Sequence, residues 1–233
     1  MNKSERAYTL LRDRIITCAI APDVPLRVQA LGQDTGLGLT PVREALRRLE
    51  AEKLVTATAN QGFRTAAITL ASLRDLEASR LLIETALISD AIARGDDSWE
   101  AGIVAAHHQL AKEPAPLGTG DAAQNALWAV RHRAFHDALV AAAGSDWLKG
   151  FHAQISAQLE RIFHFTMAER SRADSPASGA TGDAAGDLLR ASFAIAPHTA
   201  LMQACLDRDT ETALKLLDHH IRHAAAYFDA ALG

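Results

Sequence analysis

The chain has 233 residues, 48% hydrophobic and 22% charged, a composition that supports buried cores and excludes an intrinsically disordered protein. This length exceeds one typical domain, so we expect two. The N-terminus is charged and amphipathic, without the apolar run of a signal peptide, and no later run is long enough to span a membrane. We therefore expect a cytoplasmic protein without membrane contact. Its two cysteines, Cys18 and Cys205, are expected to be unpaired thiols.

The net charge of −4 conceals an asymmetry between the two parts of the chain. Residues 1–66 hold ten lysines and arginines against seven acidic residues, whereas the remainder holds fourteen against twenty-one. A basic N-terminal part can bind phosphates, while an acidic C-terminal part would repel nucleic acid. The two parts are therefore expected to have different functions.

In chain order, the first predicted element is a helix over Glu5–Ala19, where apolar residues recur at helical spacing until Pro22 and Pro25 end it. A short helix is expected at Val28–Thr35, and a turn rich in glycine follows it.

The next stretch, GLTPVREALRRLEAEKLV from Gly38 to Val55, predicts the second, recognition helix of a helix-turn-helix. Thr40 is the predicted N-cap and Pro41 the first helical residue, since proline needs no amide partner there. The residues at i, i+3, i+4 and i+7 form one apolar face: Val42, Ala45, Leu46 and Leu49. The other face carries Thr40, Arg43 and Arg47, which can contact phosphates and guanine edges. Taken alone, the segment is also compatible with an ordinary amphipathic surface helix.

Two β-prone runs follow, at Val55–Thr58 and Phe63–Ala67, and a turn of Asn60, Gln61 and Gly62 joins them. A hairpin directly after a recognition helix is typical of a winged helix-turn-helix domain. TPVREALRRLEAEKLV followed by a hairpin with NQG resembles the DNA-binding domain of the GntR family of bacterial transcription regulators. The resemblance covers about the first third of the chain.

This resemblance implies double-stranded operator DNA as the partner. The candidate DNA-binding residues are Thr40, Arg43, Arg47, Gln29, Gln61, Gly62 and Arg64. The chain departs from the family pattern at Gly38-Leu39, where members usually have Ser-Arg, and Gln29 and Gln61 are neutral where basic residues can occur. We expect normal architecture with weaker phosphate contact or an altered operator.

From residue 69 onwards the sequence predicts almost only helix. We place the winged domain at residues 1–68, a hinge at 69–72 with Ser72 capping the next helix, and a bundle at 73–233. The predicted helices of the bundle are Ser72–Arg94, Trp99–Lys112, Asp121–Ala143, Asp146–Glu169, Ile195–Leu206 and Thr210–Ala231. Small and polar residues at Ser171–Gly186 predict a flexible loop without regular secondary structure. The fold class is mostly α: an N-terminal winged helix-turn-helix with a small β-hairpin wing, plus a C-terminal all-α bundle of about six helices.

All ten histidines follow residue 106. His132 and His136 are four residues apart and project from one helix face, while His198 opens a later helix and His220 lies in the last one. Each of them alone is more often a core or surface histidine than a ligand. Neutral imidazoles that converge inside a bundle can hold Zn²⁺ or Ni²⁺ with one position left open.

Three stretches of the bundle resemble the FadR-type C-terminal (FCD) domain of one GntR subfamily: RHRAFHDALVAAAGSDWL, APHTALMQACLDRD and ALKLLDHHI. In its metal-binding members an aspartate and a histidine four residues apart join two further histidines, so the resemblance implies His136, His198 and His220 as ligands. His132 stands at the position of the aspartate. The substitution removes one negative charge and favours softer metals over magnesium or calcium.

The same resemblance implies a small carboxylate effector, which would complete the coordination of the metal. Arg80 is a candidate to hold the acid, and the alternative interpretation is that it forms a surface pair with Glu84.

Together these features predict a homodimeric DNA-binding transcriptional regulator, not an enzyme, that a small organic acid releases from its operator. An alternative is a regulator whose bundle is only a dimerisation scaffold without metal. A metal-dependent hydrolase is disfavoured, because no acidic residue stands in a motif with the histidines to act as general base.

Overall fold

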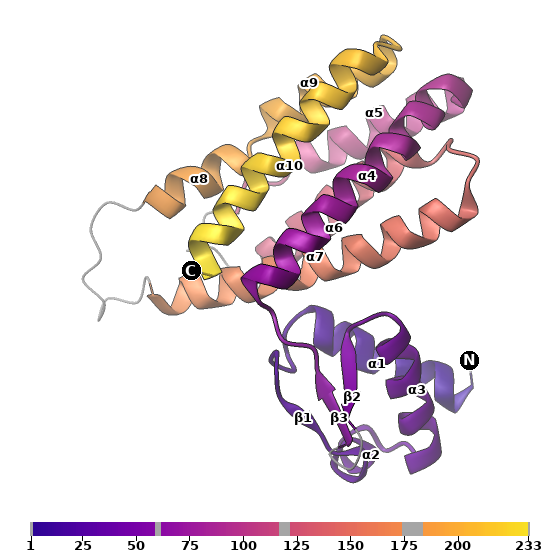
Figure 1. Cartoon of the computed structure of the whole chain (residues 1–233), viewed down its shortest axis with the longest axis vertical. Helices are drawn as coiled ribbons and strands as arrows, with labels where there is room; N and C mark the ends of the chain where they lie inside the picture. Colours follow the sequence, from indigo (N-terminus) through magenta and orange to yellow (C-terminus); the bar gives the residue numbers. More distant parts are fainter. Residues whose placement is uncertain (1, 59–61, 117–121, 174–183, 233) are drawn as a thin grey trace. The chain divides into compact units, whose positions relative to one another are not determined.

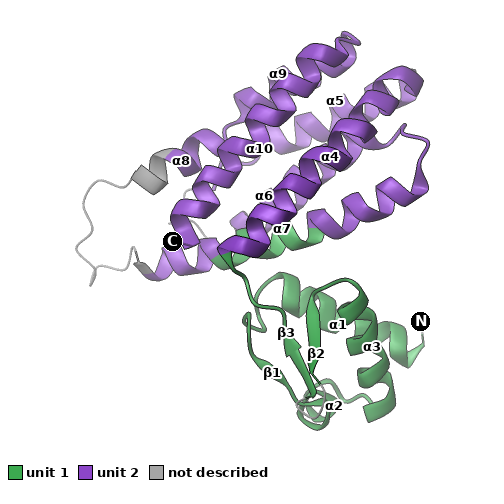
Figure 2. Cartoon of the chain, viewed as in Figure 1, with its two compact units in different colours: residues 1–69, 157–165 green, residues 70–156, 166–233 purple. Residues whose placement is uncertain are grey.

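The computed structural model describes residues 2–58, 62–116, 122–173 and 184–232 (Figure 1). The chain divides into two compact units, coloured separately in Figure 2. The first comprises Met1–Thr69 with Ala157–Phe165, and the second Leu70–Ser156 with Thr166–Gly233.

The first unit has a winged helix-turn-helix fold. Its elements are α1 (Lys3–Ile16), β1 (Pro25–Leu26), α2 (Val28–Thr35), α3 (Leu39–Ala51), β2 (Val55–Thr58) and β3 (Gly62–Thr65). The three strands form an antiparallel sheet in the order β1-β3-β2. The predicted hairpin is confirmed. Strand β1 was not predicted, because a two-residue strand has no measurable alternation.

The apolar stripe of α3 forms the centre of this unit, as its spacing predicted. Four side chains of the stripe have 0% exposure: Val42, Ala45, Leu46 and Leu49. They belong to the same core as Ala7, Leu11 and Ile15 of α1. Packing of α1 and α2 against this stripe leaves the opposite face of α3 exposed.

The turn between α2 and α3 depends on glycine. Gly36 has φ +67° at the C-cap of α2, a left-handed conformation that glycine adopts without a Cβ penalty. Helix α3 then begins at Leu39 with Gly38 at the N-cap, so the predicted Thr40 cap was wrong. Pro41 is still accommodated, because the first amides of a helix have no acceptor within it.

The second unit is a helical bundle. Its described elements are α4 (Leu70–Arg94), α5 (Asp97–Ala111), α6 (Ala122–Val140), α7 (Asp146–Ala173), α8 (Ala184–Ser192), α9 (Ile195–Leu206) and α10 (Thr210–Leu232). Helix α10 packs against α4, α8 and α9, and α5 packs against α6 and α9 (Figure 1). Within the described ranges, no helix is both long enough and apolar enough to cross a membrane.

Two features of the bundle differ from the sequence prediction. Helix α8 raises the number of described helices from about six to seven, and it overlaps the predicted loop at Ser171–Gly186. Its small residues resemble a linker, but Leu189 has 0% exposure and the helix packs on α10. Residues 174–183 of that loop lie outside the described ranges. Helix α4 begins at Leu70, so Ser72 is not its cap and most of the predicted hinge lies in its first turn.

We expect Leu46→Ala to lower the free energy of unfolding of the winged unit by about 2–5 kcal/mol, because truncation of a fully buried leucine loses apolar contacts and leaves a cavity. Urea unfolding measures this change. The matched control is Leu39→Ala on the same helix, where the side chain is 52% exposed and truncation costs little. Equal unfolding midpoints for the two variants would contradict the assigned core.

Candidate functional site

The first turns of α3 present the predicted DNA-reading residues to solvent. Thr40, Arg43 and Arg47 are all exposed. Within the described part of the chain, neither Arg43 nor Arg47 has an ion-pair partner. Arg48, by contrast, pairs with Glu5 at 2.8 Å and lies over the Tyr8 ring. Arg43 and Arg47 are therefore the two guanidinium groups of this helix available to a ligand.

The wing contributes less charge than the sequence indicated. Nη1 of Arg64 donates to the Asp23 carbonyl and lies 3.2 Å from the Asp23 carboxylate. Gln29 is exposed on α2, and Gly62 is exposed at the start of β3. The predicted contact Gln61 lies outside the described residues. Part of the positive charge of Arg64 is therefore already paired within the protein.

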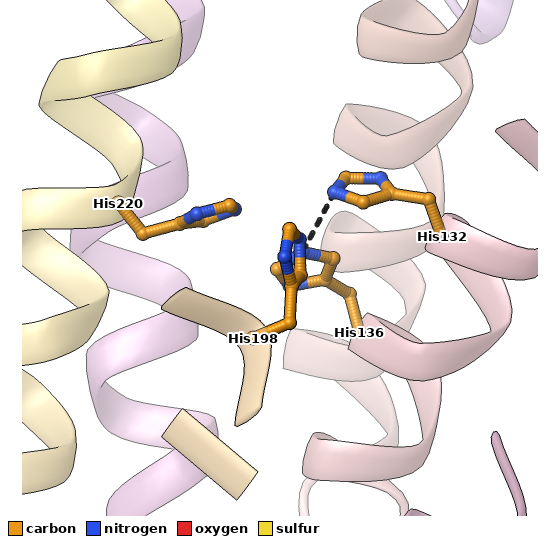
Figure 3. Close-up of side chains that lie close together, drawn as sticks. All are labelled: His132, His136, His198 and His220. Atoms are coloured by element: carbon orange, nitrogen blue, oxygen red, sulfur yellow. Dashed lines mark hydrogen bonds between the residues drawn. The ribbon is translucent and has the colours of Figure 1, made fainter. Parts of the chain in front are cut away.

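The four predicted metal ligands come together inside the second unit. Figure 3 shows His132 and His136 of α6, His198 of α9 and His220 of α10 pointing toward one another. One ligand nitrogen from each ring lies within 4.8 Å of the other three. Trp128 stacks on the His132 ring with centroids 4.5 Å apart, which covers one face of the cluster. The fold thus joins three helices around one point.

The ring nitrogens are arranged as ligands. His198 Nδ1 donates to the Ala194 carbonyl at 2.8 Å, which leaves Nε2 buried without a hydrogen-bond partner. The Nε2 atoms of His132 and His136 are 3.2 Å apart. Tetrahedral Zn–N bonds of about 2.0–2.1 Å place neighbouring nitrogens roughly 3.4 Å apart, so a small contraction of the cluster would fit an ion. An orphaned buried nitrogen is a polar group that a cation would satisfy.

The cluster is electrically neutral at pH 7. Burial lowers the pKa of His132, His136 and His220 well below its usual value, and neighbouring imidazoles and Arg80 lower it further. Burial also lowers the pKa of His198, to about 4. Unprotonated imidazole is the form that binds metals, so the lone pairs are available without proton release.

Arg80 lies next to this cluster in a buried ion pair. Its Nε donates to Glu84 Oε1 at 2.9 Å, and the two side chains are only 7% and 3% exposed. The i,i+4 pair therefore forms, but its interpretation as a surface pair is wrong. Burial alone would raise the pKa of Glu84, but Arg80 and His152 hold it lowered. The ion pair with Glu84 consequently fixes the Arg80 side chain in position.

His152 of α7 is a member of this network that sequence reasoning missed. Its Nε2 lies 3.0 Å from Asp137, and its Nδ1 lies 3.4 Å from Glu84. Burial lowers its pKa, but these two carboxylates raise it more, to about 9. His152 has no histidine at i±4 and no motif, so nothing in the sequence distinguished it. As an imidazolium, it places Glu84 between two cations.

Two protein-family models match the chain and identify its family. Residues 3–64 match the gntR family of bacterial regulatory proteins, and residues 75–223 match the FCD domain. The chain belongs to the GntR family and has the FadR-type GntR/FCD architecture. It is a DNA-binding transcriptional regulator and not an enzyme.

Particular relatives agree with this assignment. The chain is 34% identical over 216 residues to the HTH-type transcriptional repressor GlaR of Escherichia coli (strain K12), covering 92% of this chain and 90% of GlaR. It is 28% identical over 224 residues to the transcriptional regulator BphR of Paraburkholderia xenovorans (strain LB400), covering 93% and 81%.

Solved structures share the fold. E. coli McbR/YncC aligns with a TM-score of 0.73 at 19% identity, covering 99% of this chain and 98% of that one. A putative GntR regulator from Rhodococcus sp. RHA1 aligns with a TM-score of 0.71 at 19% identity, covering 99% of both chains. The predicted fold class, a winged helix-turn-helix followed by a helical domain, is confirmed.

Because the pKa of His152 is raised in the folded protein, its contribution to the free energy of unfolding should decrease as the pH rises. A folded-state pKa of about 9 lies above the unfolded value of about 6.5, so the stabilisation is complete below pH 6.5 and is lost as the pH rises through 9. The four clustered histidines have lowered pKa values, so they change the free energy of unfolding only below about pH 6.5. The difference in unfolding free energy between wild type and His152→Gln should therefore shrink from pH 6.5 to pH 9.

Urea unfolding of chelator-treated protein at the two pH values measures this difference. The control is His108→Gln, which replaces an exposed histidine of the same bundle and should follow wild type at both. Parallel pH responses of wild type and His152→Gln would show that His152 is not held as an imidazolium.

Proposed function

We propose that the protein is a homodimeric repressor whose affinity for an inverted-repeat operator is controlled by a small organic acid bound at a metal in its FCD domain. The observation that carries this proposal is the convergence of four neutral imidazoles, three buried and one half-buried, beside a buried arginine. Because a bacterial operator lies in the cytoplasm, we also propose that the protein acts there. Arg43 is assigned to base edges and Arg47 to the adjacent backbone.

The donor set favours a divalent transition metal. His132, His136, His198 and His220 would hold it through neutral nitrogen ligands, which suit Zn²⁺ or Ni²⁺, whereas Mg²⁺ and Ca²⁺ prefer oxygen. When bound, the ion would supply a full +2 charge and a coordination position for an anion. The hydrogen bond that His198 Nδ1 donates to the Ala194 carbonyl holds the ring in a ligand orientation without the ion.

Arg80 would give the histidine site its selectivity for an acid. Its guanidinium is buried and pre-oriented by Glu84, so little side-chain entropy is lost when it binds a carboxylate. The positive charge of His152 offsets part of the negative charge of Glu84, so the network does not neutralise the positive charge of Arg80 completely. A neutral alcohol or amide of the same size would gain no ionic interaction with Arg80, which favours carboxylates as effectors.

Two arguments support the proposed dimer, one from DNA recognition and one from the surface of the bundle. One recognition helix contacts few base pairs, and two-fold symmetry doubles the contacts on an inverted repeat. Leu82 of α4 and Trp147 of α7 are 75% and 80% exposed, unusually high for large apolar side chains in a monomer. These surfaces support pairing of the bundle with a second copy.

Repression is proposed because the E. coli relative is named a transcriptional repressor. A bound acid changes DNA affinity only if it binds the DNA-competent and DNA-incompetent states unequally. Residues 66–69 join β3 to α4, so the first turn of α4 is the element proposed to carry this signal. We expect operator binding without the acid and release with it.

Metal analysis tests the proposed site. Wild-type protein purified without chelator should carry about one Zn²⁺ or Ni²⁺ per chain, and His136→Ala should lose most of it, because each ligand contributes strongly to affinity. His107→Ala is the matched control. His107 lies in the same unit, with its Nε2 2.8 Å from the Thr199 hydroxyl, outside the cluster.

A His136→Ala/His220→Ala double variant gives the decisive result. Stoichiometric metal in a folded double variant would eliminate the site and leave the bundle as a dimerisation scaffold. Metal loss in His107→Ala as great as in His136→Ala would show that occupancy reports general damage to the fold.

A further inference from the structure

Strand β1 carries an arginine to the wing. Leu26 pairs with Phe63, so the next residue, Arg27, lies at the level of Gly62, where the described part of β3 begins. Arg27 also occupies the N-cap position of α2, but its side chain makes no capping hydrogen bond. An arginine thus stands where serine, threonine or aspartate is preferred for helix capping.

Arg27 and Arg43 line the same hollow on the surface of the first unit, together with Val28, Gly62 and Phe63. Both arginines are exposed. Two guanidinium groups beside one hollow repel each other unless an anion lies there. The space over Gly62 is open, since an added Cβ there would meet nothing within 4 Å. The hollow therefore has the charge and the access that a phosphate needs.

The acidic residues that flank Arg27 in the sequence are already engaged. Asp23 pairs with Arg64, and Asp34 pairs with Arg14. Within the described ranges, the Arg27 side chain has no ion-pair or hydrogen-bond partner, and only its backbone carbonyl accepts, from Leu31 N–H. Binding an anion therefore breaks no existing contact of the Arg27 guanidinium, whereas part of the charge of Arg64 is already paired with Asp23.

We propose that Arg27 binds a phosphate of the operator backbone between the first turn of α3 and the wing. The proposal rests on the proposed function, in which Arg43 contacts base edges, because Arg43 lines the same hollow as Arg27. It also accounts for the neutral residues of this chain at positions where related regulators carry basic ones, Leu39, Gln29 and Gln61. The cationic contact would be retained, but Arg27, the residue after β1, would supply it.

A phosphate contact positions a protein on DNA without reading sequence. Loss of Arg27 should therefore weaken binding to any duplex and reduce its salt dependence. The bases selected by the protein should stay the same, because Arg43 is left in place to read them.

The probes are the duplex that wild-type protein selects from a random-sequence pool and one duplex of unrelated sequence. For Arg27→Ala, the slope of log K against log salt should fall in magnitude by about 0.9 per bound protomer on both duplexes. Arg27→Lys should restore most of the slope. The control is Lys215→Ala, which removes one exposed positive charge of the bundle. Unchanged urea unfolding checks that the variants fold.

An Arg27→Ala slope equal to that of Lys215→Ala would overturn the proposal, and so would a change in the sequence that Arg27→Ala selects. Arg43→Ala separates this outcome from failure of the proposed function. It should lower affinity for the selected duplex by about 5- to 150-fold and relax the preference at one position per half-site. If Arg43→Ala binds DNA as the wild type does, Arg43 does not contact the bases and the proposed function fails, independently of the result for Arg27.

Discussion

Desolvation of four neutral imidazoles at one point of the bundle is the constraint on which the regulatory part of this structure depends. The cluster draws its rings from α6, α9 and α10, so its geometry exists only when these helices are packed. Burial removes protons from the rings, and the orphaned Nε2 of His198 costs about 1–3 kcal/mol if nothing satisfies it. A cation would convert that cost into a stabilising interaction. Occupancy and bundle packing are therefore linked, which is the property that a ligand-controlled domain needs.

A second, mostly buried network lies beside this neutral cluster. Arg80, Glu84, His152 and Asp137 alternate cation and anion, so the buried charges of Arg80, Glu84 and His152 each have a partner of opposite sign, while Asp137 is exposed. Such a network is costly to form and more costly to break at one member. It holds the guanidinium of Arg80 still beside the histidines. Under the proposed function, the fixed charge of Arg80 would recognise a small buried anion, whereas the exposed Arg43 and Arg47 of α3 would recognise the DNA backbone and bases.

The sequence predicted elements with a strong period and missed those without one. The α3 stripe repeats at i, i+3, i+4 and i+7, so both the helix and its buried face were predictable. His132 and His136 were paired by their spacing, but only family resemblance joined His198 and His220 to them, because spacing carries no information across helices. Strand β1 and helix α8 were missed, since two residues have no period and small residues in α8 resemble a linker. His152 and Arg27 owe their roles to neighbours that are distant in sequence.

The central claim is that an acid bound beside the histidine cluster and operator DNA oppose each other. Isothermal titration of small mono- and dicarboxylates into metal-loaded protein, first free and then saturated with its selected duplex, tests this most directly. The account predicts that an acid which binds the free protein binds the DNA complex about 5- to 150-fold more weakly, with the same factor for DNA in the presence of acid. Equal affinity of that acid for free and DNA-bound protein would contradict the account.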